Sequence, residues 1–147
     1  MDTKLKADIA ESATVTELLK RGFNVLLPFG DRLSYDIAAD YGDKLIKIQV
    51  KSAWIEKKTN RYVVDVRQTK TNRRKMIRKY YTDKDFDFAI IYIPDSEEFF
   101  IIPVQEFRKY KSSMTLREAN GRIPKFDRMT MKKFRNQWNL LNGPANQ

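Results

Sequence analysis

The chain has 147 residues, of which 29 are Lys or Arg and 19 are Asp or Glu, so its formal net charge is +10 at pH 7. It contains no Cys and no His, which excludes disulfides, zinc sites built on these residues, and catalysis by Cys or by a Ser–His–Asp triad. The length predicts one domain, and the positive charge predicts a polyanionic partner.

Segments that enter membranes are not expected. No apolar run approaches the ~20 residues that a membrane helix needs. Residues 1–12 contain no apolar signal-peptide core. We therefore expect a cytoplasmic protein with no membrane partner.

The first elements expected in chain order are a helix and a short strand. Residues 3–21 carry apolar side chains at helical spacing, and Gly22 is a typical residue to follow a helix. Residues 23–29 predict a short strand that Pro28 stops. The predicted apolar stripe of the helix consists of Leu5, Ile9, Val15, Leu18 and Leu19.

The stretch SYDIAADYGDKLIKIQVKSAW (34–54) predicts a β-hairpin. Two segments in it, 34–41 and 44–54, alternate polar and apolar residues with period two. The Gly42–Asp43 pair between them suits a tight two-residue turn.

This turn brings three polar residues of the hairpin together. It places Asp36 opposite Gln49, with Lys51 one diagonal step away. Cβ atoms of directly opposite residues lie about 5 Å apart, and those of diagonal neighbours about 7–8 Å apart. The three side chains are therefore expected to converge on one face of the sheet. The other face carries Ile37, Ile48 and Val50.

The rest of the chain predicts more strands and two short helices. Further strands are expected over residues 61–68, 87–93 and 98–104. Residues 71–81 are strongly basic and predict either a helix or a loop. Short helices are expected over 105–110 and 127–141, linked by a basic loop, with a tail at 142–147. This order of elements predicts an α/β or α+β domain with a mixed sheet.

The charge is divided into blocks along the chain. Residues 67–84 hold eight Lys or Arg and one acid, and residues 108–135 hold ten and two acids. Between them, residues 85–106 hold six acids and no Lys or Arg. Two discrete basic blocks predict a groove or stripe for a nucleic-acid backbone. The alternative is a generally cationic, soluble surface.

The hairpin face and the first helix together suggest a chemistry. Without Cys and His, a reaction must use carboxylates, Lys, Tyr, amides and hydroxyls, and a metal should be an oxygen-binding ion such as Mg²⁺. The Asp36 carboxylate suits such an ion, and the Lys51 ammonium suits charge that develops on a phosphate. Glu11 offers a second carboxylate, with Asp8 as its rival. The alternative is a solvated strand face and an ordinary helix glutamate.

The pattern Asp36…Gln49-Val50-Lys51 resembles the motif of the PD-(D/E)xK nucleases. In that family an Asp on one strand and a (D/E)-x-K on the next lie at the end of a hairpin, usually after a helix that carries a Glu. Two departures are visible: Tyr35 replaces the Pro, and Gln49 replaces the acidic residue. The Gln49 side chain offers an amide oxygen but no negative charge.

The resemblance extends over most of residues 1–145. The stretch AESATVTELLKRGFNVLLPFGD fits the preceding helix and strand, and VVDV fits the strand that follows. YTDKDFDFAIIYIPDSEEFFIIPV resembles the strand pair of a small PD-(D/E)xK subfamily that contains a compact homing endonuclease encoded within a bacterial group I intron. The implied fold is restriction-endonuclease-like, with a catalytic core at 1–104, a helical and basic extension at 105–141 and a tail at 142–147.

The resemblance implies a role for each matching residue. Asp36 is the principal Mg²⁺ ligand, and Glu11 is an auxiliary ligand. Gln49 is a weaker ligand or positions the water, and the Val50 carbonyl also coordinates the metal. Lys51 polarises the water or the phosphate.

DNA contacts are expected mainly from the segment that begins at residue 67. It mixes base-reading side chains with phosphate-binding ones, so we predict that it enters a groove, with a plain solvated loop as the alternative. Arg32 precedes Asp36 and is expected to touch a phosphate near the scissile bond. The other predicted contacts are Arg67, Gln68, Lys70, Asn72, Arg73, Arg74 and Lys75.

The function implied is a Mg²⁺-dependent, site-specific endonuclease that cuts double-stranded DNA. The resemblance also implies a homotetramer, since one small subunit covers little DNA and cutting two strands requires two sites related by symmetry. Residues 87–104 and 134–141 are candidate interfaces, with core as the alternative. Two other functions remain open: a Holliday-junction resolvase or repair nuclease with the same core, and a non-catalytic DNA- or RNA-binding protein.

Overall fold

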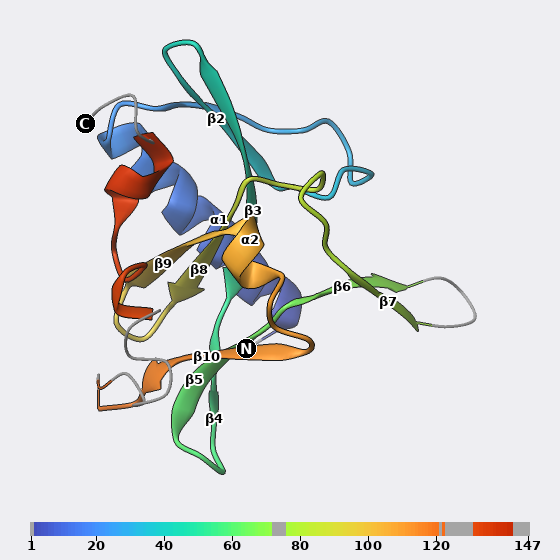
Figure 1. Ribbon diagram of the computed structural model, residues 1–147, viewed down its shortest axis with the longest axis vertical. Helices are drawn as coiled ribbons and strands as arrows, with labels where there is room; N and C mark the ends of the chain where they lie inside the picture. Colours follow the sequence, from blue (N-terminus) through green and yellow to red (C-terminus); the bar gives the residue numbers. More distant parts are fainter. Residues whose placement is uncertain (1, 72–75, 121, 123–130, 143–147) are drawn as a thin grey trace.

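A mixed five-stranded sheet, in the order β1-β2-β3-β8-β9, forms the centre of the fold (Figure 1). The computed structural model describes residues 2–71, 76–120, 122 and 131–142. Within this sheet β3 and β8 are parallel, and the other neighbouring strands are antiparallel. The predicted mixed sheet is therefore confirmed. Its strands are β1 (Asn24–Leu26), β2 (Ile37–Tyr41), β3 (Lys44–Ser52), β8 (Phe88–Ile93) and β9 (Glu98–Pro103).

Helix α1 (Thr3–Lys20) packs against β3 and β8, and three residues of the predicted stripe, Ile9, Val15 and Leu18, lie against the core there. Its buried side chains recur every four residues, at Ala10, Thr14 and Leu18. The predicted stripe is wrong at both ends, since Leu5 is 48% and Leu19 is 56% exposed. At 100° per residue these two lie about 140–180° around the helix from Thr14. The small side chain of Ala10 lets the helix lie close to the sheet.

Two hydrophobic clusters cover the two faces of the sheet. The cluster beneath α1 includes Ile48 and Ile90. The cluster on the opposite face includes Ile91 and Phe100. Since successive strand residues point to opposite faces, strands buried on both sides read as continuous apolar runs.

The segments expected as candidate interfaces, 87–104 and 134–141, contribute their apolar side chains to these clusters instead. Phe100 is fully buried, and Trp138 is 5% exposed. The core alternative is therefore confirmed for both segments.

A second, three-stranded sheet in the order β10-β5-β4 contains β4 (Trp54–Glu56), β5 (Arg61–Asp65) and β10 (Ser113–Glu118). Strand β10 lies where a basic loop was expected. Its inward side chains, Met114 and Leu116, are fully buried and alternate with polar residues. This alternation of polar and apolar residues is short, and the surrounding basic residues make it hard to recognise in the sequence.

The strand expected over 61–68 ends early, and a separate hairpin follows it. Val66 stands between β5 and β6 (Arg67–Thr71), and β6 pairs with β7 (Met76–Tyr80). The expectation of a helix or loop over 71–81 is therefore wrong for β7. Figure 1 shows this hairpin extending to one side of the molecule.

The remaining helices are short. Helix α2 (Val104–Phe107) lies close to the short helix expected at 105–110. Of the helix expected over 127–141, residues 127–130 lie outside the described residues, and the end of it is a 3₁₀ turn, η1 (Trp138–Asn142). Among the residues that the structure describes, no helix is long and apolar enough to cross a membrane.

Glu98 connects β9 to β10 and to the C-terminal segment through buried ion pairs. Its Oε2 accepts hydrogen bonds from Ser96 Oγ at 2.5 Å and from Arg117 Nε at 2.7 Å. Its Oε1 lies 2.6 Å from Arg135 Nη2. Burial raises the pKa of Glu98, but Ser96, Arg117 and Arg135 outweigh burial, so the pKa lies below its usual value of 4.5.

We expect Glu98→Gln to lower the free energy of unfolding by about 3–5 kcal/mol, because Arg117 stays buried without its carboxylate. Urea denaturation at pH 7 measures this. The wild-type carboxylate stabilises the fold above pH 4.5, and this contribution is lost as the pH falls through the lower folded pKa. The variant should therefore lose less stability than wild type upon acidification.

The control is Glu106→Gln, which removes the more exposed ion pair between Glu106 and Lys109. It should have a smaller effect on unfolding. A Glu98→Gln variant as stable as this control would contradict the prediction.

Candidate active site

The β2–β3 hairpin has the register that the sequence predicts. Ile37 pairs with Ile48, and the pairing continues to the turn. Asp36 directly precedes β2 and accepts two hydrogen bonds at its Oδ2, from Val50 N at 2.8 Å and from Gln49 Nε2 at 2.9 Å. The structure therefore brings Asp36 and Gln49 together as expected.

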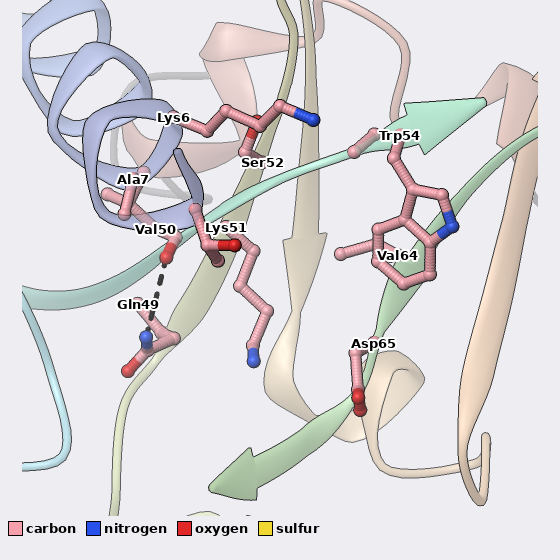
Figure 2. A pocket seen from close by; sticks show the side chains of 11 residues that line it. Lys6, Ala7, Gln49, Val50, Lys51, Ser52, Trp54, Val64 and Asp65 are labelled. Carbon is pink, nitrogen blue, oxygen red and sulfur yellow. Dashed lines mark hydrogen bonds between the residues drawn. The ribbon is translucent and has the colours of Figure 1, made fainter. Parts of the chain in front are cut away.

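The Gln49 amide lies between two oxygen atoms that suit a cation. Its Nε2 is 2.9 Å from Asp36 Oδ2 and 3.4 Å from the Val50 carbonyl oxygen. Figure 2 shows the amide nitrogen directed at Val50 and the amide oxygen directed away. The expected ligand oxygen of Gln49 thus faces away from the Val50 carbonyl, and a half-turn of the terminal amide exchanges the two atoms.

Lys51 places its ammonium on the same face, in a half-buried position. Its Nζ donates a hydrogen bond to the Arg67 carbonyl oxygen at 3.1 Å and lies 5.2 Å from the centre of the Tyr81 ring. Burial lowers the pKa of Lys51, while the charges of Asp65 and Asp36 raise it. Burial outweighs these charges, so the pKa of Lys51 lies below its usual value of 10.5.

The helix glutamate Glu11 lies close enough to the hairpin for the charge of Asp36 to change its pKa. Burial raises the pKa of Glu11, and the charges of Asp36 and Asp8 raise it further. Burial also raises the pKa of Asp36, against the lowering effects of the Val50 N–H and Lys51. A bound cation would relieve the repulsion between these carboxylates. The rival residue Asp8 is exposed.

The described residues contain no group of three Asp, Glu, His or Cys side chains that could hold a metal ion. The candidate set has two carboxylates, from Asp36 and Glu11, with the Val50 carbonyl and the Gln49 amide. All of these groups offer oxygen, which suits Mg²⁺, and Mg²⁺ usually keeps several of its waters. The donor chemistry thus fits this metal.

A cleft of about 430 Å³ opens beside the hairpin, between the start of α1 and strands β3 to β5. Figure 2 shows the Lys51 side chain on β3 and the Asp65 side chain on β5, and both residues line the cleft. Sequence reasoning missed Asp65, although an acid within the apolar run VVDV was a usable signal. It also missed Lys6 and Trp54, which line the cleft without any motif to mark them.

The predicted DNA-contacting residues fall into four groups. Arg32 is exposed in the loop before β2. The Arg67 guanidinium pairs with Asp65 at 3.2 Å, so it is engaged within the chain. Gln68 and Lys70 belong to β6. The others lie outside the described residues: Asn72, Arg73, Arg74 and Lys75.

Comparison with known proteins identifies the class that this fold and hairpin define. The family model described as PD-(D/E)XK endonuclease matches residues 1–140. The chain belongs to the PD-(D/E)XK endonuclease family, and it is a nuclease.

Among solved structures, the chain is similar to a bacterial homing endonuclease, I-Ssp6803I. The two share 44% sequence identity and superpose with a TM-score of 0.86. The match covers 100% of this chain and 98% of the other. No curated protein matches the chain by sequence.

Proposed function

We propose that the chain is a Mg²⁺-dependent homing endonuclease that cuts double-stranded DNA at a specific site. The observation that carries the proposal is the convergence of Asp36, Gln49 and Lys51 at one end of the β2–β3 hairpin, beside Glu11. The similarity to a bacterial homing endonuclease favours this function over that of a junction resolvase.

In this proposal Asp36, Glu11, Gln49 and the Val50 carbonyl hold the metal. When bound, Mg²⁺ supplies a water of lowered pKa and a positive charge beside the scissile phosphate. Gln49 contributes its amide oxygen after the half-turn described above.

Lys51 acts on the phosphate in the proposed reaction. Its ammonium has three N–H donors, and one of them already binds the Arg67 carbonyl. The other two can bind a non-bridging phosphate oxygen and stabilise its growing negative charge. Because the Lys51 side chain is half-buried, water screens this interaction less than it would at a fully exposed position.

DNA binding rests on the charge of the whole chain and on its projecting hairpin. The net charge of +10 favours a phosphate backbone. The β6–β7 hairpin leaves the body of the molecule and has the shape of an element that enters a groove (Figure 1). We expect Arg32, which is exposed in the loop before β2, to contact a phosphate near the scissile bond.

We also propose that the active form is a homotetramer. A chain of 17.4 kDa covers little DNA. A specific cut in both strands requires two active sites related by symmetry, and additional subunits lengthen the contacted sequence.

Cleavage of a plasmid library with random inserts tests the proposed function. Purified protein with Mg²⁺ should yield discrete linear products, and EDTA should abolish them because the carboxylates then lack their cation. Sequencing the ends of the products gives the target. A four-way junction of unrelated sequence should stay intact under the same conditions.

Uncut plasmid in Mg²⁺, with DNA binding retained, would overturn the proposal. Preferential cutting of the junction would assign the chain to the resolvases instead.

A further inference from the structure

The Lys51 ammonium is contacted by both ends of the β6–β7 hairpin. Its hydrogen-bond acceptor, the carbonyl of Arg67, belongs to the first residue of β6. The ring beneath it, that of Tyr81, belongs to the residue directly after β7. Arg67 pairs with Tyr80 across the hairpin, so both contacts come from its base.

The Tyr81 ring is firmly held. Tyr81 is 8% exposed and packs edge-on against Phe86, with ring centres 5.0 Å apart. Its ring centre lies 6.0 Å from that of Phe107. Burial raises the pKa of Tyr81, as do the charges of nearby aspartates, so the ring stays neutral at pH 7. The contact with Lys51 is therefore one between a cation and an aromatic face.

The Arg67 carbonyl is also held in place. The Asp65 carboxylate accepts hydrogen bonds from Arg67 N at 2.8 Å and from Arg67 Nε at 3.2 Å. Val66 N donates to the Ser112 carbonyl at 3.0 Å. The bend between β5 and β6 is thus fixed to the body of the protein.

We propose that Tyr81 is a positioning residue for Lys51, so that the base of the β6–β7 hairpin sets where the Lys51 ammonium lies in the active site. The inference rests on the proposed function, since it requires Lys51 to act in cleavage. A displacement of about 1 Å in a reacting group can lower a rate by about 100-fold. Loss of the ring should therefore reduce cleavage rather than DNA binding.

The test compares Tyr81→Leu, which removes the ring, with Tyr81→Phe, which keeps it. Phe107→Leu is the control, because it removes a buried ring of the same cluster and leaves the Tyr81 ring beneath Lys51 in place. Single-turnover cleavage is measured with saturating protein on DNA that carries the target. DNA affinity is measured separately in EDTA.

We expect Tyr81→Leu to cleave about 10- to 100-fold more slowly at unchanged affinity. Tyr81→Phe should restore the rate, because Phe also presents an aromatic face to a cation. Phe107→Leu should cleave much faster than Tyr81→Leu. Equal losses in Tyr81→Leu and Phe107→Leu, or no loss in Tyr81→Leu, would overturn the inference.

A second readout does not depend on cleavage activity and is made on the wild-type protein. The ring current of Tyr81 should shift the ε-methylene protons of Lys51 upfield in the NMR spectrum of the wild-type protein, with the signal assigned by its absence from Lys51→Arg. An unshifted signal would overturn the inference. A shifted signal in a protein that cuts no DNA would instead show that the contact exists and that the proposed function fails.

Discussion

Lys51→Ala is expected to lower the cleavage rate by about 10²- to 10³-fold and to leave DNA affinity nearly unchanged. The side chain lies inside the cleft and has only its ammonium to offer to the reacting phosphate. Many surface cations share the binding of the DNA backbone, so the loss of one half-buried lysine changes affinity little. Single-turnover cleavage and equilibrium binding to the target DNA, measured on the same preparation, separate the two effects.

Lys47→Ala is a close control for this variant. Lys47 lies on the same strand and the same face, and its Nζ also donates to a backbone carbonyl, that of Lys84, at 2.9 Å. It also lies over a tyrosine ring, 5.9 Å from the centre of Tyr35. Lys47→Ala should cleave at nearly the wild-type rate. If Lys51→Ala lost binding and cleavage in parallel, Lys51 would be a DNA-binding residue rather than a catalytic one.

Asp36→Asn should have an effect of similar size for a different reason. The substitution keeps an oxygen that can accept the Val50 N–H but removes the charge that the metal requires. A loss of several kcal/mol of metal-assisted stabilisation corresponds to a rate about 10³-fold lower. Cleavage should stay low at high Mg²⁺, and calorimetric titration of the protein with Mg²⁺ should show weakened binding.

The control for this experiment is Asp40→Asn, on β2, the strand that Asp36 directly precedes. Asp40 pairs with Leu45 near the turn and is not among the proposed metal ligands. Its substitution should preserve both Mg²⁺ binding and cleavage. Full activity of Asp36→Asn would remove the principal ligand from the proposed site and contradict the metal-dependent mechanism.

The hairpin was predictable because its determinants are local. A Gly–Asp turn and strict alternation fix the register, and the register alone brings Asp36 to Gln49. The partners of Lys51 were not predictable in this way. Arg67 and Tyr81 are 16 and 30 residues away in the sequence, and they reach Lys51 only through the β5–β6 bend and the pairing of β6 with β7.

Helix α1 shows a second limit of sequence reasoning. Counting apolar residues favoured the large side chains, including Leu5 and Leu19, whereas close packing on the sheet selected Ala10 and Thr14. Thr14 can be fully buried because its hydroxyl donates to the Ala10 carbonyl at 2.8 Å. Such a local hydrogen bond leaves no trace in a pattern of hydrophobicity.

The alternation of β2 and β3 has a consequence for how this site tolerates insertions and deletions. A one-residue change in the length of the Gly42–Asp43 turn would shift the register and reverse the faces of one strand. Gln49 would then point toward α1, and Ile48 would point into the cleft. The same register shift would therefore disrupt both the hydrophobic core and the candidate active site. Any version of the hairpin that still buries its isoleucines correctly also presents its polar residues correctly, so selection for a stable fold preserves this arrangement as well.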